Sequence, residues 1–351
     1  MMFQLNTLSD LSTLPFDTVI DVRSPAEYAE DHIPGAINLP VLDNDERARV
    51  GTIYVQDSPF EARKTGAALV ARNAAKHIEE HLLAHDRNWK PLVYCWRGGQ
   101  RSGSFATILK QVGWRAKVVG GGYRSYRRLV KRALYDTPFS APVTLLDGNT
   151  GSAKTEILKL LQTRGVQVID LEGLANHRGS LFGAMSGGQP SQKAFEGALA
   201  QVVTGIDPSR PVVIEAESSK VGERIVPPGL WSAMKNAPRL EVQAPLAARA
   251  KYLVTAYRDM IEDTARLAGT LDRLRPYHPA DRIRDWHTLA ETGDMERLAS
   301  ELMALHYDAR YSKARNRTDN ITPLPVAGLG PKYLADVADR IAAILGYSVS
   351  R

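Results

Sequence analysis

The chain has 351 residues, a net charge of +6 and an apolar fraction of 44%, which is ordinary for a globular protein and enough for two domains. No apolar run is long enough to cross a bilayer, and the N-terminal residues lack the charged and apolar blocks of a signal peptide. The single cysteine, Cys95, excludes an internal disulfide. We therefore expect a cytoplasmic enzyme with no membrane partner.

Strands alternate with helices in the first part of the chain, which predicts a parallel sheet with helices on both faces. The expected elements are a strand at 17–22, a helical turn at 26–30, a strand at 37–39, a charged loop at 41–58 and a helix at 60–85. They continue with a strand at 92–94, a helix at 105–112, a strand at 116–119, a glycine turn at 120–122 and a basic helix at 123–134.

Cys95 lies where the short apolar strand at 92–94 gives way to a loop of small and basic residues. Backbone N–H groups at the N-terminus of the following helix carry partial positive charge, and Arg97 and Arg101 add full charges. Such a setting favours the thiolate, which is the nucleophilic form, so we expect Cys95, Arg97 and Arg101 to be catalytic. The alternative is a buried cysteine that serves only as a small apolar residue.

The region around Cys95 is strongly basic, because no acidic residue occurs from Arg87 to Tyr135. A basic block around a nucleophile indicates a polyanionic substrate. The basic helix contributes the residues expected to bind it, namely Arg124, Arg127, Arg128, Lys131 and Arg132. A solvated surface with no partner is the alternative.

A proline-punctuated linker at 136–142 precedes a second α/β region, which begins with a strand at 143–147 and a helix at 156–163. Between them lies the sequence GNTGSAKT, which has the order of a phosphate-binding P-loop: Gly148, Asn149, Thr150, Gly151, Ser152, Ala153, Lys154 and Thr155. Lys154 would supply a point charge, and Thr155 can bind Mg²⁺ or a phosphate oxygen. Ala153 replaces the preferred glycine, so we expect its backbone not to be left-handed.

Further polar residues follow the next two expected strands, at 166–170 and 211–214. His177, Arg178, Ser180 and Gln189 lie among glycines and apolar residues, which is typical of a binding loop. Glu215 and Glu217 end the later strand and could face phosphate or metal, or be solvated loop charges. From residue 246 onward the sequence is mostly helical, with basic and aromatic residues that could bind nucleic acid: Arg258, Arg310, Tyr311, Lys313 and Arg315.

The first 137 residues resemble the rhodanese family. The similarity lies in DVRSPAEYAEDHIPGAINLP at 21–40, in the Cys95 loop and in VVGGGYRSYRR at 118–128. The resemblance implies that Cys95 carries sulfur or selenium as a persulfide-type group. Five residues separate Cys95 from Arg101, one more than in the usual sulfur-transferring loop, and this longer loop is similar to those of rhodanese-fold phosphatases and arsenate reductases.

The whole chain resembles the tRNA 2-selenouridine synthase family through four stretches: CWRGGQRS at 95–102, residues 38–52, GNTGSAKT at 148–155 and DLEGLANHRGSLFG at 170–183. The resemblance implies an α/β protein with a rhodanese-like domain at 1–137 and a P-loop domain at 138–351 that ends in a helical part. It further implies a selenium transferase that is also a tRNA geranyltransferase. Such an enzyme converts wobble 2-thiouridine in tRNA to 2-selenouridine through an S-geranyl intermediate.

The same resemblance implies the substrates and their sites. Geranyl diphosphate and selenophosphate, the latter supplied by a selenophosphate synthetase, are co-substrates, and no cofactor is tightly bound. The P-loop would hold the departing diphosphate, with Mg²⁺ as an optional partner, and the basic helix would bind the anticodon arm. Leu181, Phe182 and Met185 would cover the prenyl tail. The residues expected to bind substrate are Asp170, His177, Arg178, Ser180, Phe182, Glu215 and Glu217.

Three other functions stay open at this stage. The Cys95–Arg101 spacing allows a cysteine phosphatase, and the rhodanese resemblance allows a sulfurtransferase, either of them fused to a nucleotide-binding domain. A phosphatase would need its general acid from outside the stretch between Arg87 and Tyr135, which has none. The P-loop allows a nucleotide kinase or ATPase, although the chain lacks an NKxD-type guanine motif. A non-catalytic RNA-binding protein is the third alternative.

Overall fold

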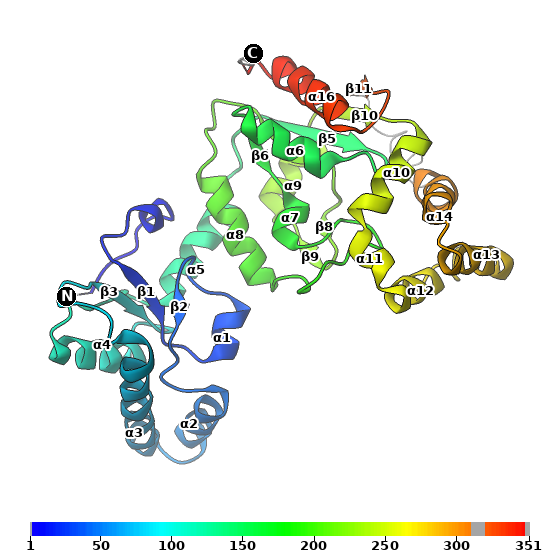
Figure 1. The fold of residues 1–351 in the computed structure, drawn as a ribbon. Helices are drawn as coiled ribbons and strands as arrows, with labels where there is room; N and C mark the ends of the chain where they lie inside the picture. The colour runs from blue at the N-terminus through cyan, green and yellow to red at the C-terminus, as the bar shows by residue number, and fades with distance from the viewer. Residues whose placement is uncertain (1, 310–319, 348–351) are drawn as a thin grey trace. The chain divides into compact units, whose positions relative to one another are not determined.

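The computed structural model describes residues 2–309 and 320–347 of the chain (Figure 1). Contacts divide the chain into two compact units. Unit 1 comprises Met1–Thr137 together with Pro190–Gly205, and unit 2 comprises Pro138–Gln189 together with Ile206–Arg351. The break after Thr137 falls in the proline-punctuated linker. The segment Pro190–Gly205 belongs with unit 1, which a division of the sequence into two consecutive stretches does not anticipate.

Unit 1 is built on a parallel sheet with the strand order β2-β1-β3-β4. Its strands are β1 (Thr18–Asp21), β2 (Ile37–Asn38), β3 (Pro91–Tyr94) and β4 (Lys117–Val118). Asp21 at the end of β1 pairs in register with Tyr94 at the end of β3. The carboxyl ends of the two central strands therefore meet at one edge of the sheet, and Cys95 follows directly at that edge.

The helices of unit 1 begin with the short 3₁₀ helix η1 (Ser9–Thr13), α1 (Pro25–Glu30), α2 (Asn44–Gln56) and α3 (Pro59–His77). They continue with α4 (Gln100–Val112), α5 (Tyr123–Lys131) and α8 (Gln192–Thr204). Wider π-helical turns extend α3 over Ile78–Leu82 and α5 over Arg132–Asp136. Helix α4 begins five residues earlier than the sequence pattern predicted, so the end of the Cys95 loop becomes the first turn of the helix.

The expected loop at 41–58 was wrong, because helix α2 occupies most of it. Asp43 accepts a hydrogen bond from the Glu46 amide and Glu46 accepts one from the Asp43 amide, so the two residues form a capping box. No residue of α2 is buried. The helix therefore lacks the apolar stripe from which a helix is recognised in a sequence.

Unit 2 has a five-stranded parallel sheet with the order β11-β10-β5-β7-β6. The strands are β5 (Val143–Gly148), β6 (Gln167–Ile169), β7 (Val212–Glu215), β10 (Arg239–Gln243) and β11 (Ile321–Pro325). A separate antiparallel ribbon consists of β8 (Lys220–Val221) and β9 (Arg224–Ile225). The chain fills one side of β5 first and then the other, so a topological switch point lies beside β5, where such sheets bind ligands.

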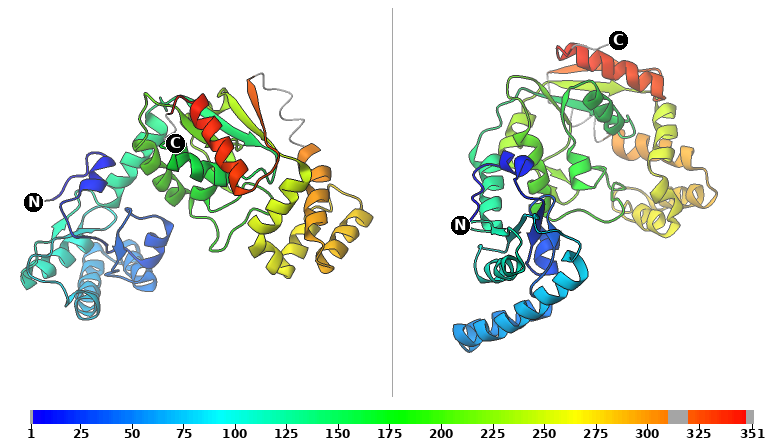
Figure 2. Two further views of the ribbon diagram at one scale, coloured as in Figure 1. Left: turned by 45° about the horizontal axis from the view of Figure 1, so that its top comes forward. Right: turned by 60° about the vertical axis from the view of Figure 1, so that its left-hand side comes forward.

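The helices of unit 2 are α6 (Lys154–Thr163), α7 (Leu171–Ala175), α9 (Pro228–Lys235), α10 (Leu246–Ala256), α11 (Arg258–Glu262), α12 (Thr264–Asp272), α13 (Ala280–Glu291), α14 (Met295–Leu302) and α16 (Pro331–Ile344). A π-helical turn extends α14 over Met303–Tyr307. Helices α6 and α16 pack on the sheet around one apolar cluster. Helices α11 to α14 gather around a second cluster with the fully buried Trp286, and Figure 2 shows them as a separate group beside the sheet.

Strand β11 is an exception to the expected helical C-terminal part. Its sequence ITPLP contains two prolines, which lack the N–H needed inside a sheet but are tolerated on an edge strand, and β11 is at the edge. None of the helices within residues 2–309 and 320–347 has both the length and the apolar character required to span a membrane.

Candidate active sites

Cys95 follows β3 and its side chain is buried, with 4% of its surface exposed. The Ser102 hydroxyl, in the first turn of α4, donates a hydrogen bond to the Cys95 Sγ at 3.2 Å. The thiol thus sits between a strand end and a helix N-terminus, as the sequence pattern predicted.

Two close backbone approaches fix the shape of the Cys95 loop. Gly98 and Gly122 have φ of +68° and +59°, which side chains rarely adopt. A β-carbon on Gly122 would lie 2.2 Å from the Cys95 carbonyl oxygen, and one on Gly98 would lie 2.6 Å from the Val119 oxygen. The Tyr123 amide donates to the Cys95 carbonyl at 2.9 Å. The loop is therefore clamped against the glycine turn that precedes α5.

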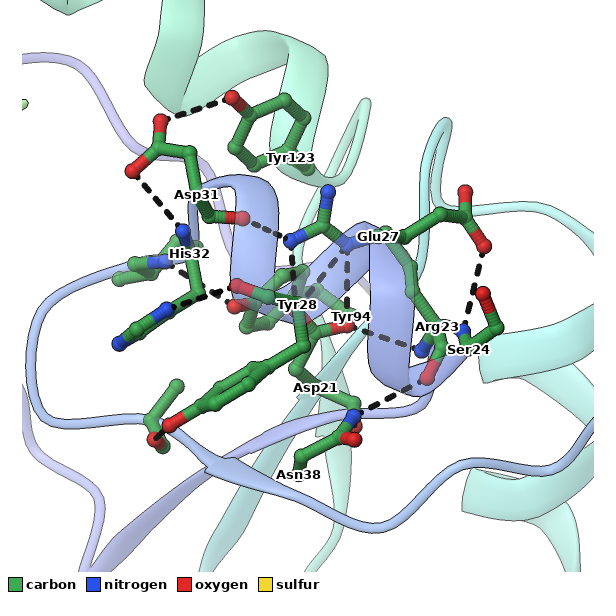
Figure 3. A network of polar contacts seen from close by, with 12 residues as sticks. Asp21, Arg23, Ser24, Glu27, Tyr28, Asp31, His32, Asn38, Tyr94 and Tyr123 are labelled. Carbon is green, nitrogen blue, oxygen red and sulfur yellow. Dashed lines mark hydrogen bonds and ion pairs between the residues drawn. The ribbon is translucent and has the colours of Figure 1, made fainter. Parts of the chain in front are cut away.

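A buried polar network supports this clamp (Figure 3). Arg23, with 1% of its surface exposed, donates to both carboxylate oxygens of Asp21 and to the Asp31 carbonyl. Its guanidinium lies 4.0 Å from the ring centroid of Tyr123, a cation–π contact. The Tyr123 hydroxyl in turn donates to Asp31 at 2.7 Å. The network therefore holds Tyr123, whose amide donates to the Cys95 carbonyl, in place.

The charges in this network are set by competing effects. Burial opposes the positive form of Arg23, but the hydrogen bonds and charge of Asp21 outweigh it and raise the Arg23 pKa. Burial raises the pKa of Asp31, although the Tyr123 hydrogen bond acts in the opposite direction. In the sequence, these residues stood out only as part of the rhodanese resemblance. An arginine and an aspartate at the end of a buried strand were the signal that such a pair lies inside the protein.

The two arginines predicted to flank Cys95 have different surroundings. Arg97 is exposed. Arg101 donates to Glu27 of α1 at 2.7 Å, so its charge is already partly neutralised. Burial alone would raise the pKa of Glu27, but the hydrogen bond and charge of Arg101 outweigh it and lower that pKa. A carboxylate therefore does lie beside this basic loop, and it comes from outside the stretch that has no acidic residue.

The basic residues of α5 and its extension also divide into two groups. Arg124, Arg128, Lys131 and Arg132 are exposed, as nucleic-acid binding requires. Arg127 instead forms an ion pair with Glu196 of α8 and donates to the Lys193 carbonyl, and Tyr135 donates to Glu196 at 2.7 Å. Arg127 therefore joins α5 to α8, and the structure gives it a packing role that its sequence position did not reveal.

The P-loop of unit 2 joins β5 to α6, and Thr150 to Thr155 line a pocket. The Lys154 ammonium donates to the Gly148 carbonyl at 3.3 Å. Among the described residues, the buried Ser152 hydroxyl and the Asn149 side-chain oxygen have no hydrogen-bond partner. Arg249 of α10 donates to the Thr150 carbonyl at 3.1 Å and pairs with Asp308 at 2.7 Å. The loop amides, Lys154 and the Ser152 hydroxyl are together suited to bind an anion with phosphate oxygens.

The expectation for Ala153 was wrong. Its φ of 57° and ψ of 31° are left-handed, and Asn176 is the other non-glycine residue with positive φ among those described. A left-handed alanine costs on the order of 1 kcal/mol. The buried methyl group, which packs in the apolar cluster under α6, offsets part of this cost.

Three glutamates, Glu172, Glu215 and Glu217, lie near the P-loop pocket. Glu215 is fully buried at the end of β7, accepts a hydrogen bond from the Glu172 amide at 2.5 Å and does not line the pocket. Glu172 and Glu217 do line it, and both have an oxygen within 2.7 Å of the point where a β-carbon on Gly179 would lie. Burial, and then the charge of Glu172, raise the pKa of Glu217 to about 8. One proton is therefore held in this carboxyl pair at neutral pH.

The other predicted substrate-binding residues are brought to the same place. Asp170, His177, Arg178 and Ser180 line the P-loop pocket with Met185. Arg178 pairs with Asp259 at 2.8 Å and lies over the Tyr257 ring. Burial, and then the charge of Arg178, lower the pKa of His177, so its ring is neutral. Gln189 instead donates to the carbonyls of Ala175 and Val221 and has a structural role.

A second, apolar pocket adjoins the P-loop pocket, and no pattern in the sequence indicated it. Helices α10, α11, α12 and α14 supply most of its walls. Four residues line both pockets: Thr150, Ser180, Leu253 and Tyr257. Phe182, predicted to cover an apolar tail, lines this pocket, whereas Leu181 packs against the helical core. Apolar residues from four separate helices give no local signal, so only the folded chain reveals the pocket.

Comparison with known proteins identifies the family. The profile described as the tRNA 2-selenouridine synthase AAA domain matches residues 141–278, and the rhodanese-like domain profile matches residues 5–129. The tRNA 2-selenouridine synthase of Alcanivorax borkumensis is 34% identical over 278 residues, which are 77% of this chain and 75% of that protein. The chain belongs to the tRNA 2-selenouridine synthase family.

Two more relatives of the same name support this assignment. Those of Psychromonas ingrahamii and Aeromonas salmonicida are 35% and 36% identical, over 71% and 73% of this chain and 67% and 69% of their own lengths. Family membership confirms the resemblance seen in the sequence. It also confirms the fold class of a rhodanese-like α/β unit followed by a P-loop α/β unit with a helical C-terminal part.

Two features bear on ligands that members of this family could hold. Within residues 2–309 and 320–347, no group of three or more His, Cys, Asp or Glu side chains is arranged to bind a metal ion. Of the basic and aromatic residues expected to contact nucleic acid near the C-terminus, Arg258 is exposed and pairs with Glu262. The others, Arg310, Tyr311, Lys313 and Arg315, lie outside the described residues.

Proposed function

We propose that this protein converts 2-thiouridine at the wobble position of tRNA to 2-selenouridine in two steps. Unit 2 transfers a geranyl group from geranyl diphosphate to the thiocarbonyl sulfur, and unit 1 replaces the alkylated sulfur with selenium from selenophosphate. The observation that carries the proposal is the apolar pocket that meets the P-loop pocket at Thr150, Ser180, Leu253 and Tyr257. A nucleotide would need no such pocket, whereas an anion with an apolar tail would fill both.

The first step has a clear division of labour in unit 2. The thiocarbonyl sulfur attacks the first carbon of the geranyl chain, the bond from that carbon to the diphosphate oxygen breaks, and the uridine N3 loses its proton. Lys154 and the loop amides would stabilise the charge that develops on the departing diphosphate. The Ser152 hydroxyl, buried without a partner, would bind the same oxygens. Mg²⁺ bound through Thr155 could share this charge.

The second step fits the surroundings of Cys95. Alkylation turns the sulfur on the base into a thiolate leaving group, so a selenium nucleophile can add to the base carbon and expel it. The Cys95 thiolate would attack the phosphorus of selenophosphate, a reactant made by a selenophosphate synthetase. The phosphorus–selenium bond breaks, selenide leaves with its electron pair and adds to the base carbon, and water then releases phosphate from the sulfur. Arg97 is unpaired among the described residues and exposed, so it is better placed than Arg101 to hold the phosphate.

The tRNA would be held by phosphate contacts. Arg124, Arg128, Lys131 and Arg132 present exposed cations on α5 and its extension, in the same unit as Cys95. Such contacts give affinity without sequence specificity and weaken with salt. We expect the protein to act in the cytoplasm, where its tRNA substrates are.

The deciding experiment is mass spectrometry of wobble nucleosides after the full-length protein is incubated with thiolated tRNA, geranyl diphosphate and selenophosphate. We expect S-geranyl-2-thiouridine when selenophosphate is omitted and 2-selenouridine when both co-substrates are present. Selenouridine formed without geranyl diphosphate from thiolated tRNA would contradict the two-step route. Hydrolysis of ATP at a rate unaffected by geranyl diphosphate would favour a nucleotide-using P-loop.

A further inference from the structure

A third hollow lies in unit 1 between helices α2 and α3. Its apolar lining comes mainly from Leu42, Val50, Tyr54, Val55, Ala67 and Val70. We call it the α2–α3 groove. Neither the fold nor the two sites described above account for it.

Part of the apolar lining of this groove is exposed, namely Tyr54, Val55 and Ala67, whereas Leu42 and Val70 are buried in the core of unit 1. Helix α2 buries none of its residues, and Val55 and Tyr54 are 83% and 58% exposed. Two glycines, Gly51 and Gly66, also line the groove, one from each helix. A β-carbon on Gly66 would come within 3.5 Å of Val50. The two helices thus form a trough with a buried apolar floor and exposed apolar side chains along it, which marks a place where an apolar ligand or partner binds.

The edge of the groove is positively charged. Arg47, Arg63 and Arg101 line it. Among residues 2–309 and 320–347, the carboxylate that pairs with them is Glu27, at 3.9 Å from Arg47 and 2.7 Å from Arg101. Two arginines share one glutamate, and Arg63 forms no ion pair with a described residue, so the edge keeps an excess of positive charge. An occupant that combines an apolar group with nearby phosphates complements this surface.

The groove also begins at the loop of Cys95. Gln100, Arg101 and Ser104 of the first turns of α4 form part of its wall, and Ser102 of the same turn donates to the Cys95 Sγ. A ligand that lies along the groove therefore has one end at the helix turn that borders the sulfur.

We propose that the α2–α3 groove binds the S-geranyl tail of the alkylated wobble uridine during the selenium step, with the flanking tRNA phosphates on Arg47 and Arg63. The inference rests on the proposed function and adds a second prenyl site to it. When selenium adds to the base carbon, the carbon–sulfur bond breaks and its electron pair leaves with the geranylthiolate, which then takes a proton from solvent. The tail must therefore lie close to Cys95, and the groove gives it an apolar place. The geranyl group would then act as a handle that selects alkylated tRNA for selenation.

The test uses full-length protein, selenophosphate and two pre-alkylated tRNAs, one S-geranylated and one S-methylated, so that the geranylation step is bypassed. Val55→Asp puts a charge in the groove at an exposed position, and Ala67→Trp fills it. Leu83→Asp is the matched control, because Leu83 is 71% exposed in the same unit but does not line the groove. We expect the groove variants to lose about tenfold in kcat/KM on S-geranylated tRNA and to keep wild-type kcat/KM on S-methylated tRNA.

A charge variant gives an independent readout. Arg63→Gln should weaken binding of both tRNAs equally and reduce the dependence of log Kd on log salt by about one. The control Leu83→Asp should match wild type on both substrates.

Wild-type activity of the groove variants on S-geranylated tRNA would overturn the proposal, and so would an equal loss on both tRNAs, which would mean that the groove binds something the two share. Failure of the proposed function has a different signature: wild-type protein would then selenate neither alkylated tRNA.

Discussion

The Cys95 loop and the P-loop follow the same plan, since each leads from a buried parallel strand into a helix N-terminus, but they solve the backbone problem differently. The Cys95 loop and the glycine turn that it packs against have glycines, Gly98 and Gly122, at the tight positions where a β-carbon would collide with a carbonyl oxygen. The P-loop puts Ala153 in a left-handed conformation and buries its methyl group. The first loop is thus shaped by close backbone contacts, and the second tolerates strain because apolar packing offsets it.

The two loops also differ in what surrounds them. The buried Arg23–Asp21 ion pair and the hydrogen-bonded Tyr94 and Tyr123 form a network next to the Cys95 loop (Figure 3). The P-loop opens into a large pocket with a carboxyl pair on one side and an apolar extension on the other. A rigid cradle suits a covalent carrier, which must be held in one geometry, whereas an open pocket suits a substrate that enters and a diphosphate that leaves. The predictions below test this contrast.

The largest effect is expected from Cys95→Ser. It should abolish selenium incorporation, because a serine hydroxyl at neutral pH is not ionised and cannot displace selenide from selenophosphate. S-geranyl-2-thiouridine should accumulate in tRNA and can be measured by mass spectrometry of nucleosides. If both steps were lost together, the division of labour between the two loops would be wrong.

Arg23→Met tests the rigid support of the first loop. It leaves Asp21 buried and unpaired, so we expect unit 1 to lose about 3–5 kcal/mol of stability. Hydrogen exchange followed by mass spectrometry should show reduced protection of β1 and β3 but not of β5 and β7. Arg115→Met, at an exposed arginine of the same unit, is the control and should change stability by less than about 0.5 kcal/mol. Equal protection in Arg23→Met and wild type would contradict the role of the network.

Lys154→Ala tests the second loop. It should slow geranylation about 100-fold, because the positive charge that stabilises the departing diphosphate oxygens is removed. Selenation of tRNA that is already geranylated should stay at the wild-type rate, as measured by nucleoside mass spectrometry with each substrate in turn. An unchanged prenyl step would remove the P-loop from the proposed mechanism.

Glu217→Gln tests the carboxyl pair. The pKa of Glu217 is about 8 in the folded protein and 4.5 in its ordinary state. Between pH 4.5 and 8, therefore, the folded protein holds a proton on Glu217 that the unfolded chain has lost. The contribution of Glu217 to stability is therefore present below about pH 4.5 and falls as pH rises toward 8, by on the order of 5 kcal/mol. Urea unfolding of unit 2 at a series of pH values should show a smaller decline for Glu217→Gln than for wild type. Parallel declines would mean that Glu217 titrates normally.

The smallest effect is expected from Ala153→Gly. Relief of the left-handed strain and loss of the buried methyl group nearly cancel, so stability should change by less than about 0.5 kcal/mol in chemical unfolding. The reverse change in the other loop, Gly122→Ala, should destabilise unit 1 by more than about 2 kcal/mol, because its methyl group would overlap the Cys95 carbonyl. Similar effects at the two positions would remove the contrast between the loops.

The sequence by itself predicted what depends on neighbours in the chain: the strand–loop–helix order around Cys95 and Lys154, the linker before the second unit and the exposed cations of α5. It did not predict α2, which buries no residue, or β11, whose prolines are tolerated only because the strand lies at the edge. Nor did it predict that Arg127 would join two helices that are far apart in the sequence.

Only the tertiary structure decided which side chains meet. The pairing of Arg101 with Glu27, the convergence of Glu172 and Glu217 over Gly179 and the apolar pocket beside the P-loop all join residues separated by tens of positions. Local patterns follow from backbone geometry, which acts over a few residues, so they can be seen in the sequence. Charge pairing and cavity shape depend on packing between distant segments, and no local pattern encodes them.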